Sequence, residues 1–245
     1  MKDYLYDGSF DGLLTAVFYA YTEKEPVRLF KEADYKPYLL SEPIIVKTEM
    51  DKSDRVYQGI FSRLSHTTLT NIYYLYLSEI PDSETLAFEY IKLCFKYTDT
   101  INLAKNNDMI RMVDKYAKRV LMESHRLKGF VRFKEITPLV FYAQIEPDHD
   151  ILPLILGHFE KRFSDQHFII HDLKREYAIV YNLKEAYLHD LSIEEGEKLL
   201  HFTAGDPFEE LFKSFYKSAT IEERINDRQR RSYMPKRYWK HLVEL

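Results

Sequence analysis

The spacing of apolar residues changes along the chain, and this change constrains the fold more than any other feature. From about residue 51 to residue 127, apolar side chains recur with the 3.6-residue period of an α-helix. The clearest case is 108–127, where Met112, Val113 and Leu127 belong to one apolar side. The pattern predicts four helices, at 51–64, 67–79, 83–98 and 108–127.

The residues before this helical region favour short strands and one helix. We expect a strand at 4–6, a turn, and a helix over 13–21. Either Ser9 or Asp11 can cap that helix, because their side-chain oxygens accept bonds from its first N–H groups. Further strands are expected at 27–30 and 44–48.

The residues after the helical region predict a ββαββ unit over 129–182. Gly129 is expected to end the last helix, and Asp148 or Asp150 to cap the single helix of the unit. Two consecutive hairpins favour an antiparallel sheet within an α+β fold. The expected elements are strands at 130–136 and 139–145, a helix at 151–163, and strands at 168–170 and 177–181.

A chain of 245 residues is long enough to bury a sizeable core, and we expect one large domain, 1–245. Its C-terminal part predicts helices at 193–201, 206–218 and 221–231, with a short one after Pro235. The domain then has four parts, at 1–50 (strands and a helix), 51–128 (helical), 129–182 (the ββαββ unit) and 183–245 (helical and basic).

Composition narrows the classes of protein. Cys94 is the single cysteine, which excludes an internal disulfide and any cysteine-rich metal centre, and we expect it to pack in the core. Only seven glycines are present, and neither the dinucleotide fingerprint nor the Walker A motif occurs. We therefore expect no cofactor. Because the sequence shows neither a signal-peptide pattern nor an apolar run long enough for a bilayer, we expect a cytoplasmic protein without membrane contact.

The charge is distributed unevenly, although the net charge is only −4. Residues 114–134 carry seven Lys or Arg against two acids, and residues 222–241 carry seven against three. Two basic segments in an otherwise acidic chain favour a polyanionic partner such as DNA. The candidate nucleic-acid-binding residues are Lys115, Lys118, Arg126, Lys128, Arg132, Arg224, Arg228, Arg231, Lys236, Arg237, Trp239 and Lys240.

The C-terminal segment combines basic and aromatic side chains. Arg224, Arg228 and Arg231 have helical spacing, so they share a face that can follow phosphates. The aromatic residues Tyr233, Tyr238 and Trp239 follow them and either stack on unpaired bases or attach this segment to the rest of the protein. The pattern favours single-stranded or distorted DNA over intact duplex.

Four stretches together resemble one family. They are YDGSFDGLLTAVFYAY at 6–21, LKGFVRFKE at 127–135, IEPDHDILPLILGHFEKRF at 145–163 and ERINDRQRRSYMPKRYWKHLVEL at 223–245. The chain is similar to uncharacterised DNA-metabolism or DNA-repair proteins built on a domain of unknown function. The resemblance implies an association with a radical-SAM DNA-repair protein, and in some relatives fusion to a uracil-DNA-glycosylase-like domain. Any such chemistry would belong to a partner, because one cysteine cannot hold a radical-SAM cluster.

Acidic and imidazole side chains concentrate at 146–150. Glu146, Asp148 and His149 are candidates for acid–base catalysis, together with His171 if the second hairpin folds over them. Asp148 and His149 are also candidate metal ligands. The same residues also have a purely structural explanation, in which Asp148 caps the helix and His149 is buried and hydrogen-bonded to a carboxylate.

A second pair of acids, Asp7 and Asp11, lies at the first strand–helix junction and is another candidate metal site. Turn formation and helix capping explain this pair as well. Likewise, His171 and Asp172, with Arg175 nearby, are most simply a polar turn.

These observations leave three hypotheses. The leading one is a DNA-binding accessory protein in DNA repair or modification that works with a separate catalytic partner. The second is a DNA-processing enzyme, either a metal-dependent phosphodiesterase or a base-processing hydrolase, that uses the 146–149 cluster. The third is a module that binds only protein and whose basic segments contact an acidic partner.

Overall fold

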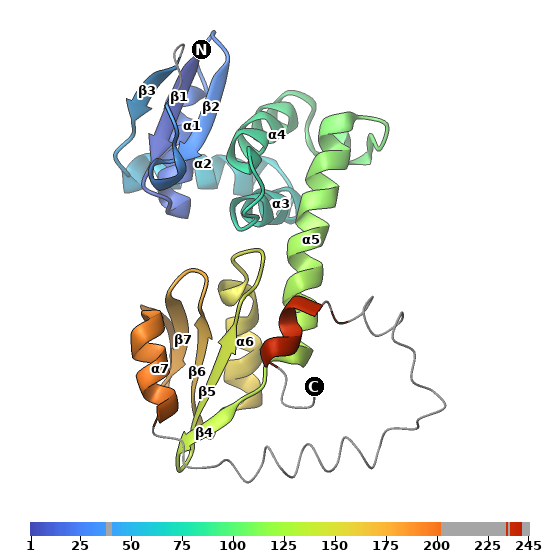
Figure 1. Ribbon diagram of the computed structural model, residues 1–245. Coiled ribbons are helices and arrows are strands. Elements are labelled where there is room, and N and C mark those ends of the chain that lie inside the picture. Colours follow the sequence, from blue (N-terminus) through green and yellow to red (C-terminus); the bar gives the residue numbers. More distant parts are fainter. Residues whose placement is uncertain (38–40, 202–233, 235, 242–245) are drawn as a thin grey trace. The chain divides into compact units, whose positions relative to one another are not determined.

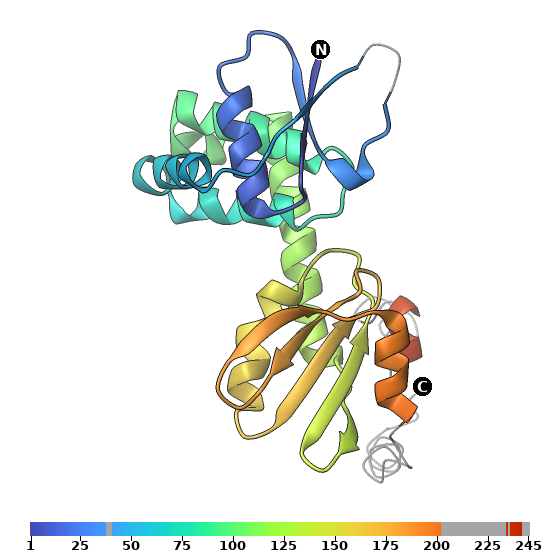
Figure 2. The same cartoon turned by 90° about the vertical axis from the view of Figure 1, so that its left-hand side faces the viewer.

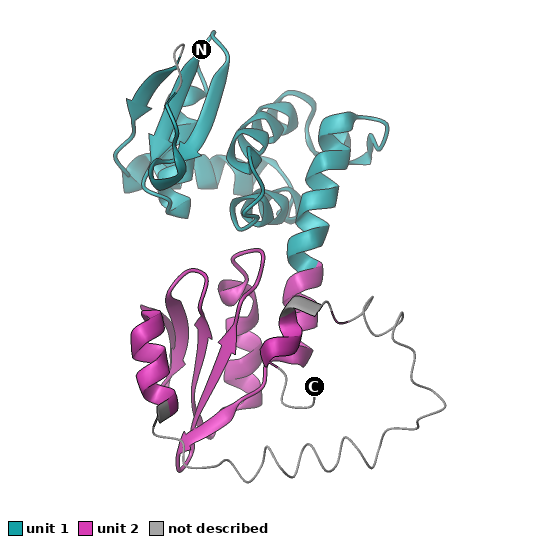
Figure 3. Ribbon diagram, in the orientation of Figure 1, with its two compact units in different colours: residues 1–121 teal, residues 122–245 magenta. Residues whose placement is uncertain are grey.

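The protein is described here by a computed structural model that covers residues 1–37, 41–201, 234 and 236–241. Its internal contacts form two compact units, Met1–Leu121 and Met122–Leu245, which Figure 3 shows in different colours. Both units combine helices with strands, which confirms the expected mixture of the two in its general form.

Unit 1 begins with a three-stranded parallel sheet (Figure 1). The first strand is central, and the other two pair with it in parallel on either side. The strands predicted at 4–6 and 27–30 are confirmed, whereas the third lies at 42–45 and shares only residues 44 and 45 with the predicted 44–48. The elements are β1 (Lys2–Tyr6), α1 (Phe10–Ala20), β2 (Val27–Lys31), a short 3₁₀ helix (Glu32–Asp34) and β3 (Glu42–Ile45).

Ser9 is the residue that caps α1, which decides between the two predicted candidates. Its Oγ accepts a hydrogen bond from the backbone N–H of Gly12 at 2.9 Å. Asp11 lies instead in the first turn, where a negative charge interacts favourably with the helix dipole. The apolar residues of α1, Leu13, Leu14 and Val17, are buried in the core of the unit.

Four helices follow in the chain, and the predicted helical region is confirmed with small shifts at the ends. The last of them, α5, begins in unit 1 and ends in unit 2. They are α2 (Met50–Arg63), α3 (His66–Tyr76), α4 (Ser83–Tyr97) and α5 (Asp108–Phe130), with a 3₁₀ helix at Asp99–Leu103. Asn107 begins α5, because its Oδ1 accepts bonds from the N–H groups of Met109 and Ile110. Cys94 is fully buried in α4, as expected, and burial raises the pKa of its thiol to about 11.

Two details of α5 differ from the sequence-based expectation. The helix passes through Gly129 and ends at Phe130, so the predicted stop at Gly129 was wrong, and the strand expected from 130 begins at Lys134. Met112 was assigned to the apolar side, but 43% of it is exposed, whereas its neighbour Val113 is buried. With 3.6 residues per turn, successive residues lie about 100° apart around the helix axis, so Val113 can face the core while Met112 faces solvent.

Unit 2 is built on a five-stranded sheet with the order β4-β5-β6-β7-β8. Its pairs are antiparallel except for β5 and β6, which are parallel. The predicted antiparallel sheet was therefore wrong, and the sheet is mixed. The reason is the helix between β5 and β6, because a crossover of this length returns the chain in the same direction. The elements are β4 (Lys134–Thr137), β5 (Val140–Ile145), α6 (Leu152–Arg162), β6 (His167–Asp172), β7 (Tyr177–Tyr181), β8 (Ala186–Asp190), α7 (Ile193–His201) and a 3₁₀ helix (Lys236–His241).

The strand β8 was missed, because 183–245 was predicted to be helical. It is an edge strand whose residues 187–190 are all exposed, so it lacks the alternation that indicates a half-buried strand. The turn before it is stabilised by Asn182, whose Oδ1 accepts bonds from the N–H groups of Lys184 and Glu185, both at 3.0 Å. The predicted helix at 193–201 is confirmed, whereas those at 206–218 and 221–231 lie outside the described residues.

The two helices α6 and α7 cover opposite faces of this sheet (Figure 1 and Figure 2). On the α6 side, Phe168 packs among the rings of Phe133, Phe159 and Phe163. On the α7 side, Gly196 approaches Tyr142 and His171 so closely that a side chain has no room. Gly196 therefore determines how near α7 lies to the sheet.

Replacing Gly196 with alanine tests this close approach. The added Cβ would lie 2.5 Å from the Tyr142 hydroxyl oxygen and 2.6 Å from His171 Nδ1, so α7 must move outward. We expect Gly196→Ala to lower the free energy of unfolding by about 1–3 kcal/mol in urea denaturation. Gly157→Ala in α6 is the matched control, since nothing lies within 4 Å of its added Cβ. Alanine there should stabilise by roughly 0.5–1 kcal/mol, and equal effects of the two changes would contradict the packing.

Candidate functional site

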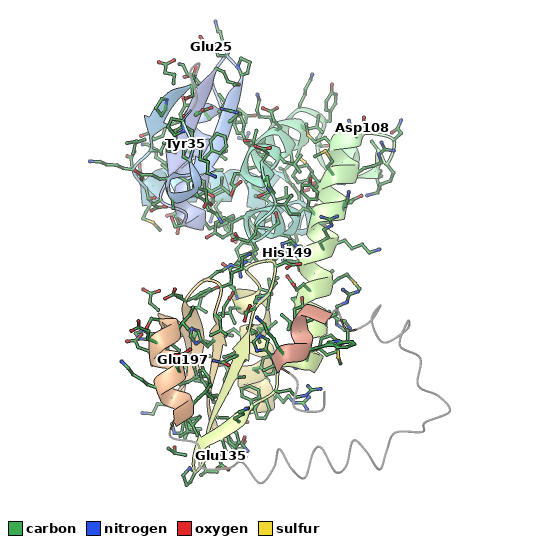
Figure 4. All side chains as sticks on the ribbon, in the orientation of Figure 1. Glu25, Tyr35, Asp108, Glu135, His149 and Glu197 are labelled. Carbon is green, nitrogen blue, oxygen red and sulfur yellow. The ribbon has the colours of Figure 1, made fainter. Side chains whose placement is uncertain are left out.

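The segment Glu146–Asp150 connects β5 to α6, and Figure 4 marks its His149. The register pairs Ile145 with Asp172, so the segment starts beside the turn between β6 and β7. Neither aspartate of the segment caps α6, because Ile151 occupies the cap position and makes no side-chain cap bond. The predicted capping role of Asp148 or Asp150 was therefore wrong.

The buried carboxylate of Glu123 on α5 holds this segment. Glu123 is 4% exposed and accepts bonds from the N–H groups of Asp148 at 3.0 Å and His149 at 2.8 Å. The hydroxyl of Tyr238 donates a third bond to it. Burial by itself raises the pKa of Glu123, but these bonds and the nearby His149 outweigh burial and leave the pKa below its ordinary value. Glu123 is therefore an ionised carboxylate inside unit 2.

The other side of the segment is bound by the turn between β6 and β7. The carbonyl of Asp148 accepts bonds from Lys174 Nζ at 3.1 Å and from the Arg175 guanidinium at 3.0 Å. Arg175 also pairs at 2.6 Å with Asp172, which is fully buried. Burial raises the pKa of Asp172, and the bonds to Arg175 and the turn amides offset this only in part. The predicted polar turn therefore has a structural role, because it binds the segment before α6.

The remaining carboxylates of the segment also have partners within unit 2. Glu146 forms an ion pair with Lys240 at 2.5 Å, and the His241 Nε2 lies 3.3 Å from the same oxygen. Asp150 accepts a hydrogen bond from the hydroxyl of Tyr177, whose pKa is raised by burial and by this carboxylate. These contacts fix the segment to the sheet and to the C-terminal 3₁₀ helix.

The two candidate histidines do not come together. His149 lies beside Glu123, whereas His171 is fully buried, with its Nδ1 2.7 Å from the Tyr142 hydroxyl under α7. Successive residues of a strand point to opposite faces, so His171 faces α7 while Asp172 faces the α6 side. Burial lowers the pKa of His171. The predicted grouping of His171 with Glu146, Asp148 and His149 is therefore not formed.

The acids at the first strand–helix junction are bound by hydroxyl groups. Asp7 accepts bonds from Ser9 Oγ at 2.6 Å and Thr48 Oγ1 at 2.7 Å, and Asp11 from Ser53 Oγ at 2.6 Å. Burial raises the pKa of Asp7, but these bonds outweigh it and lower the pKa overall. Across the described residues, His, Cys, Asp and Glu side chains form no group of three that could hold a metal ion.

Two of the basic candidates on α5, Lys115 and Lys118, form an exposed row with the neighbouring Arg119. Lys115, Lys118 and Arg119 are exposed, and none of them forms an ion pair with a carboxylate of the described residues. The acids near the start of the helix are paired, Asp108 with Arg111 and Asp114 with Lys105. From residue 115 to the end of α5 the one carboxylate is the buried Glu123. Arg126, Lys128 and Arg132 of the same basic segment are half-buried.

The described part of the C-terminal segment is attached to unit 2. Tyr238 is 2% exposed, bonds to Glu123 and packs its ring 6.2 Å from that of Phe130. Trp239 is half-buried and donates its indole N–H to the carbonyl of Met234 at 3.0 Å. Of Lys236 and Arg237 only the backbone is described, and Arg224, Arg228, Arg231 and Tyr233 lie outside the described residues.

Glu123 is the residue whose role sequence analysis missed, whereas Tyr238 has the second of its two predicted roles and attaches the C-terminal segment. Glu123 follows Val120 by three positions and precedes Leu127 by four, so it lies on the apolar side of the helix. An acid at such a position indicates a buried carboxylate that needs donors. That signal was present in the sequence, but the donors come from segments far along the chain.

The fold and these contacts define a protein of two mixed helix–strand units, with a buried carboxylate at the centre of the second unit's contacts. Residues 81–244 match the model of a family described as a domain of unknown function, DUF4130, and the chain belongs to this family. None of the curated proteins matches the chain. In the part of the chain that the structure describes, no helix has the length and apolarity required to cross a membrane.

Removing the Tyr238 hydroxyl tests the contact between the C-terminal segment and α5. Tyr238→Phe leaves the ionised, buried Glu123 without one of its donors. We expect the free energy of unfolding to fall by about 1.5–3 kcal/mol, the usual range for a hydrogen bond to a charged group. Urea denaturation measures it.

Tyr187→Phe is the matched control, because Tyr187 is 42% exposed on β8. It should change stability by less than about 0.5 kcal/mol. The role of Tyr238 is contradicted if the two tyrosine variants unfold at the same urea concentration.

Proposed function

We propose that this protein binds DNA as an accessory factor in DNA repair or modification and works with a separate catalytic partner. The observation that carries the proposal is the row Lys115, Lys118 and Arg119 on α5. These three cations are exposed, and the described residues supply no carboxylate to pair with them. Unpaired cations in a row are suited to phosphates, because binding DNA releases its condensed counterions.

The C-terminal segment supports the same proposal. It carries seven further Lys or Arg at 222–241, of which Lys240 pairs with Glu146, and Tyr233 would stack on unpaired bases. Tyr238 is buried and bonded to Glu123, so it is not available to stack on a base. Stacking on bases by this segment therefore depends on Tyr233 and Trp239. Aromatic faces together with cations favour single-stranded or distorted DNA.

The acidic and imidazole candidates favour an accessory role over catalysis. Glu146, Asp150 and Asp172 are each bound by a side chain of unit 2, and the backbone of Asp148 and His149 is bound by Glu123. Groups engaged in this way stabilise the fold. The chemistry would then come from a partner, and the resemblance to DNA-metabolism proteins implies a radical-SAM repair protein or a uracil-DNA-glycosylase-like protein for that role.

Neutralising the exposed row tests the proposal. We expect the protein to bind a single-stranded oligonucleotide, with affinity that falls steeply as salt increases. In the triple variant Lys115→Ala/Lys118→Ala/Arg119→Ala, binding should weaken and the slope of log K against log salt should flatten by about one for each lost phosphate contact. Fluorescence anisotropy at several salt concentrations gives both quantities.

A matched control removes three other exposed lysines, Lys24, Lys47 and Lys161, and should leave binding nearly unchanged. Equal losses in the two triple variants would mean that net charge, not this row, determines binding. Undetectable binding of every form of DNA at low salt would contradict the proposal. Metal-dependent cleavage of the oligonucleotide that is lost in His149→Ala would replace it with the enzyme hypothesis.

A further inference from the structure

A pocket of about 430 Å³ lies in unit 1 between α1, α2 and α4. This volume is within the range of about 300–1,000 Å³ that is usual for small-molecule sites. Its base is apolar, with Val17 and Ile91 buried and Val56 half-buried. None of its lining residues belongs to the basic row of α5 or to the segment at 146–150.

The walls of the pocket are aromatic. Phe18, Tyr19, Tyr21 and Phe95 line it, and the rings of Tyr21 and Phe95 meet edge to face with centroids 6.0 Å apart. Tyr19 and Tyr21 are 40% and 43% exposed. Partly exposed aromatic faces around a hollow favour a flat, aromatic ligand, because stacking on a π-face needs no specific hydrogen-bond pattern.

Two arginines of α2 line the same pocket, with a glycine between them. Arg55, Gly59 and Arg63 are spaced four residues apart, so they share one face of the helix, and the arginines are about 12 Å apart along its axis. The Arg55 guanidinium lies 5.5 Å from the centre of the Phe18 ring. Within the described residues, neither arginine has a carboxylate at ion-pair distance. A guanidinium presents a planar fork that matches the oxygens of a phosphate.

Gly59 keeps the space between the arginines open. Glycine inside a helix costs roughly 0.5–1 kcal/mol relative to alanine, yet no neighbour excludes a side chain here. A Cβ at Gly59 would meet only the Phe95 ring, at the ordinary contact distance of 3.8 Å. A larger side chain at this position would therefore occupy the pocket itself.

We propose that this pocket binds a nucleoside 5′-phosphate, with the base against the aromatic walls and the phosphate at Arg55 or Arg63. The ligand is a free mononucleotide or the 5′-phosphorylated end of a DNA strand, since both present the same chemistry. A neighbouring hollow of about 320 Å³ shares Tyr21 and is lined by Lys92, Lys96 and Glu89, which provides room for the next nucleotide of a strand. The proposal is independent of the basic row of α5.

The experiment titrates the full chain with 2′-deoxyadenosine 5′-monophosphate (dAMP) in a calorimeter, and with deoxyadenosine as the ligand without phosphate. We expect dAMP to bind and the nucleoside to bind at least about tenfold more weakly, because a phosphate–guanidinium bond is charge-assisted. Arg55→Ala/Arg63→Ala should reduce the affinity for dAMP to that for the nucleoside. Lys24→Ala/Lys47→Ala, which removes the same charge elsewhere, should leave it unchanged.

Gly59→Leu is the variant that isolates the pocket. It fills the space and keeps both arginines, so dAMP binding should be lost while the melting temperature stays equal or rises. A 5′-phosphorylated oligonucleotide distinguishes the two sources of the ligand. Binding of dAMP indicates a free nucleotide. Binding of the oligonucleotide alone, if it is lost in Gly59→Leu, indicates the end of a strand. Either result supports the site. No binding of either ligand at millimolar concentration, or binding unchanged in Gly59→Leu, overturns it.

These outcomes are separate from those of the proposed function. Gly59→Leu leaves Lys115, Lys118 and Arg119 in place, so it should not change the salt-dependent binding of unphosphorylated single strands. Conversely, the triple variant of the α5 row should bind dAMP with the affinity of the unmodified protein.

Discussion

The buried carboxylate of Glu123 is the interaction on which unit 2 depends. Burying an ionised carboxylate costs several kcal/mol unless hydrogen-bond donors compensate for the lost water. Here the donors are the Asp148 and His149 amides and the Tyr238 hydroxyl. They belong to the connection between β5 and α6 and to the C-terminal 3₁₀ helix. One charge on α5 therefore fixes two segments that have no regular pairing of their own with that helix.

This arrangement explains why the conspicuous acidic segment is a structural element. A run with three carboxylates and an imidazole is typical of catalytic and metal sites, because such groups transfer protons and bind cations. In this fold, Glu123, Arg175, Tyr177 and Lys240 bind the segment from several directions. Polar groups next to a buried charge need such partners, since an unsatisfied member would cost free energy. The exposed row on α5 takes no part in these contacts.

Much of the local structure could be predicted from the sequence, because helices and strands impose different spacings on apolar residues. Local spacing does not report pairing direction, which is why the parallel pair β5 and β6 was missed. It also misses an exposed edge strand such as β8, which buries neither face. The pairing of Glu123 with Tyr238 spans 115 residues, and no local pattern indicates a contact over that distance.

The candidate residues also differ in whether local sequence spacing could predict their positions. Lys115 and Lys118 were predicted to bind nucleic acid, which requires them to reach solvent, and both are exposed. The grouping of His171 with His149 depended on the direction of side chains in β6, which follows from register and not from proximity in sequence. The pocket with Arg55 and Gly59 was not found at all, because its lining residues come from three helices.

The central claim is that Glu123 binds the segment before α6 through its backbone, and amide hydrogen exchange measured by NMR tests it most directly. The Asp148 and His149 amides lie in a connection without regular structure, so strong protection from exchange requires their bonds to Glu123. The account predicts slow exchange of both amides in the unmodified protein, and faster exchange of both in Glu123→Ala under conditions where the amides of β6 and β7 stay protected. Rapid exchange of both amides in the unmodified protein, or protection that persists in Glu123→Ala, would contradict it.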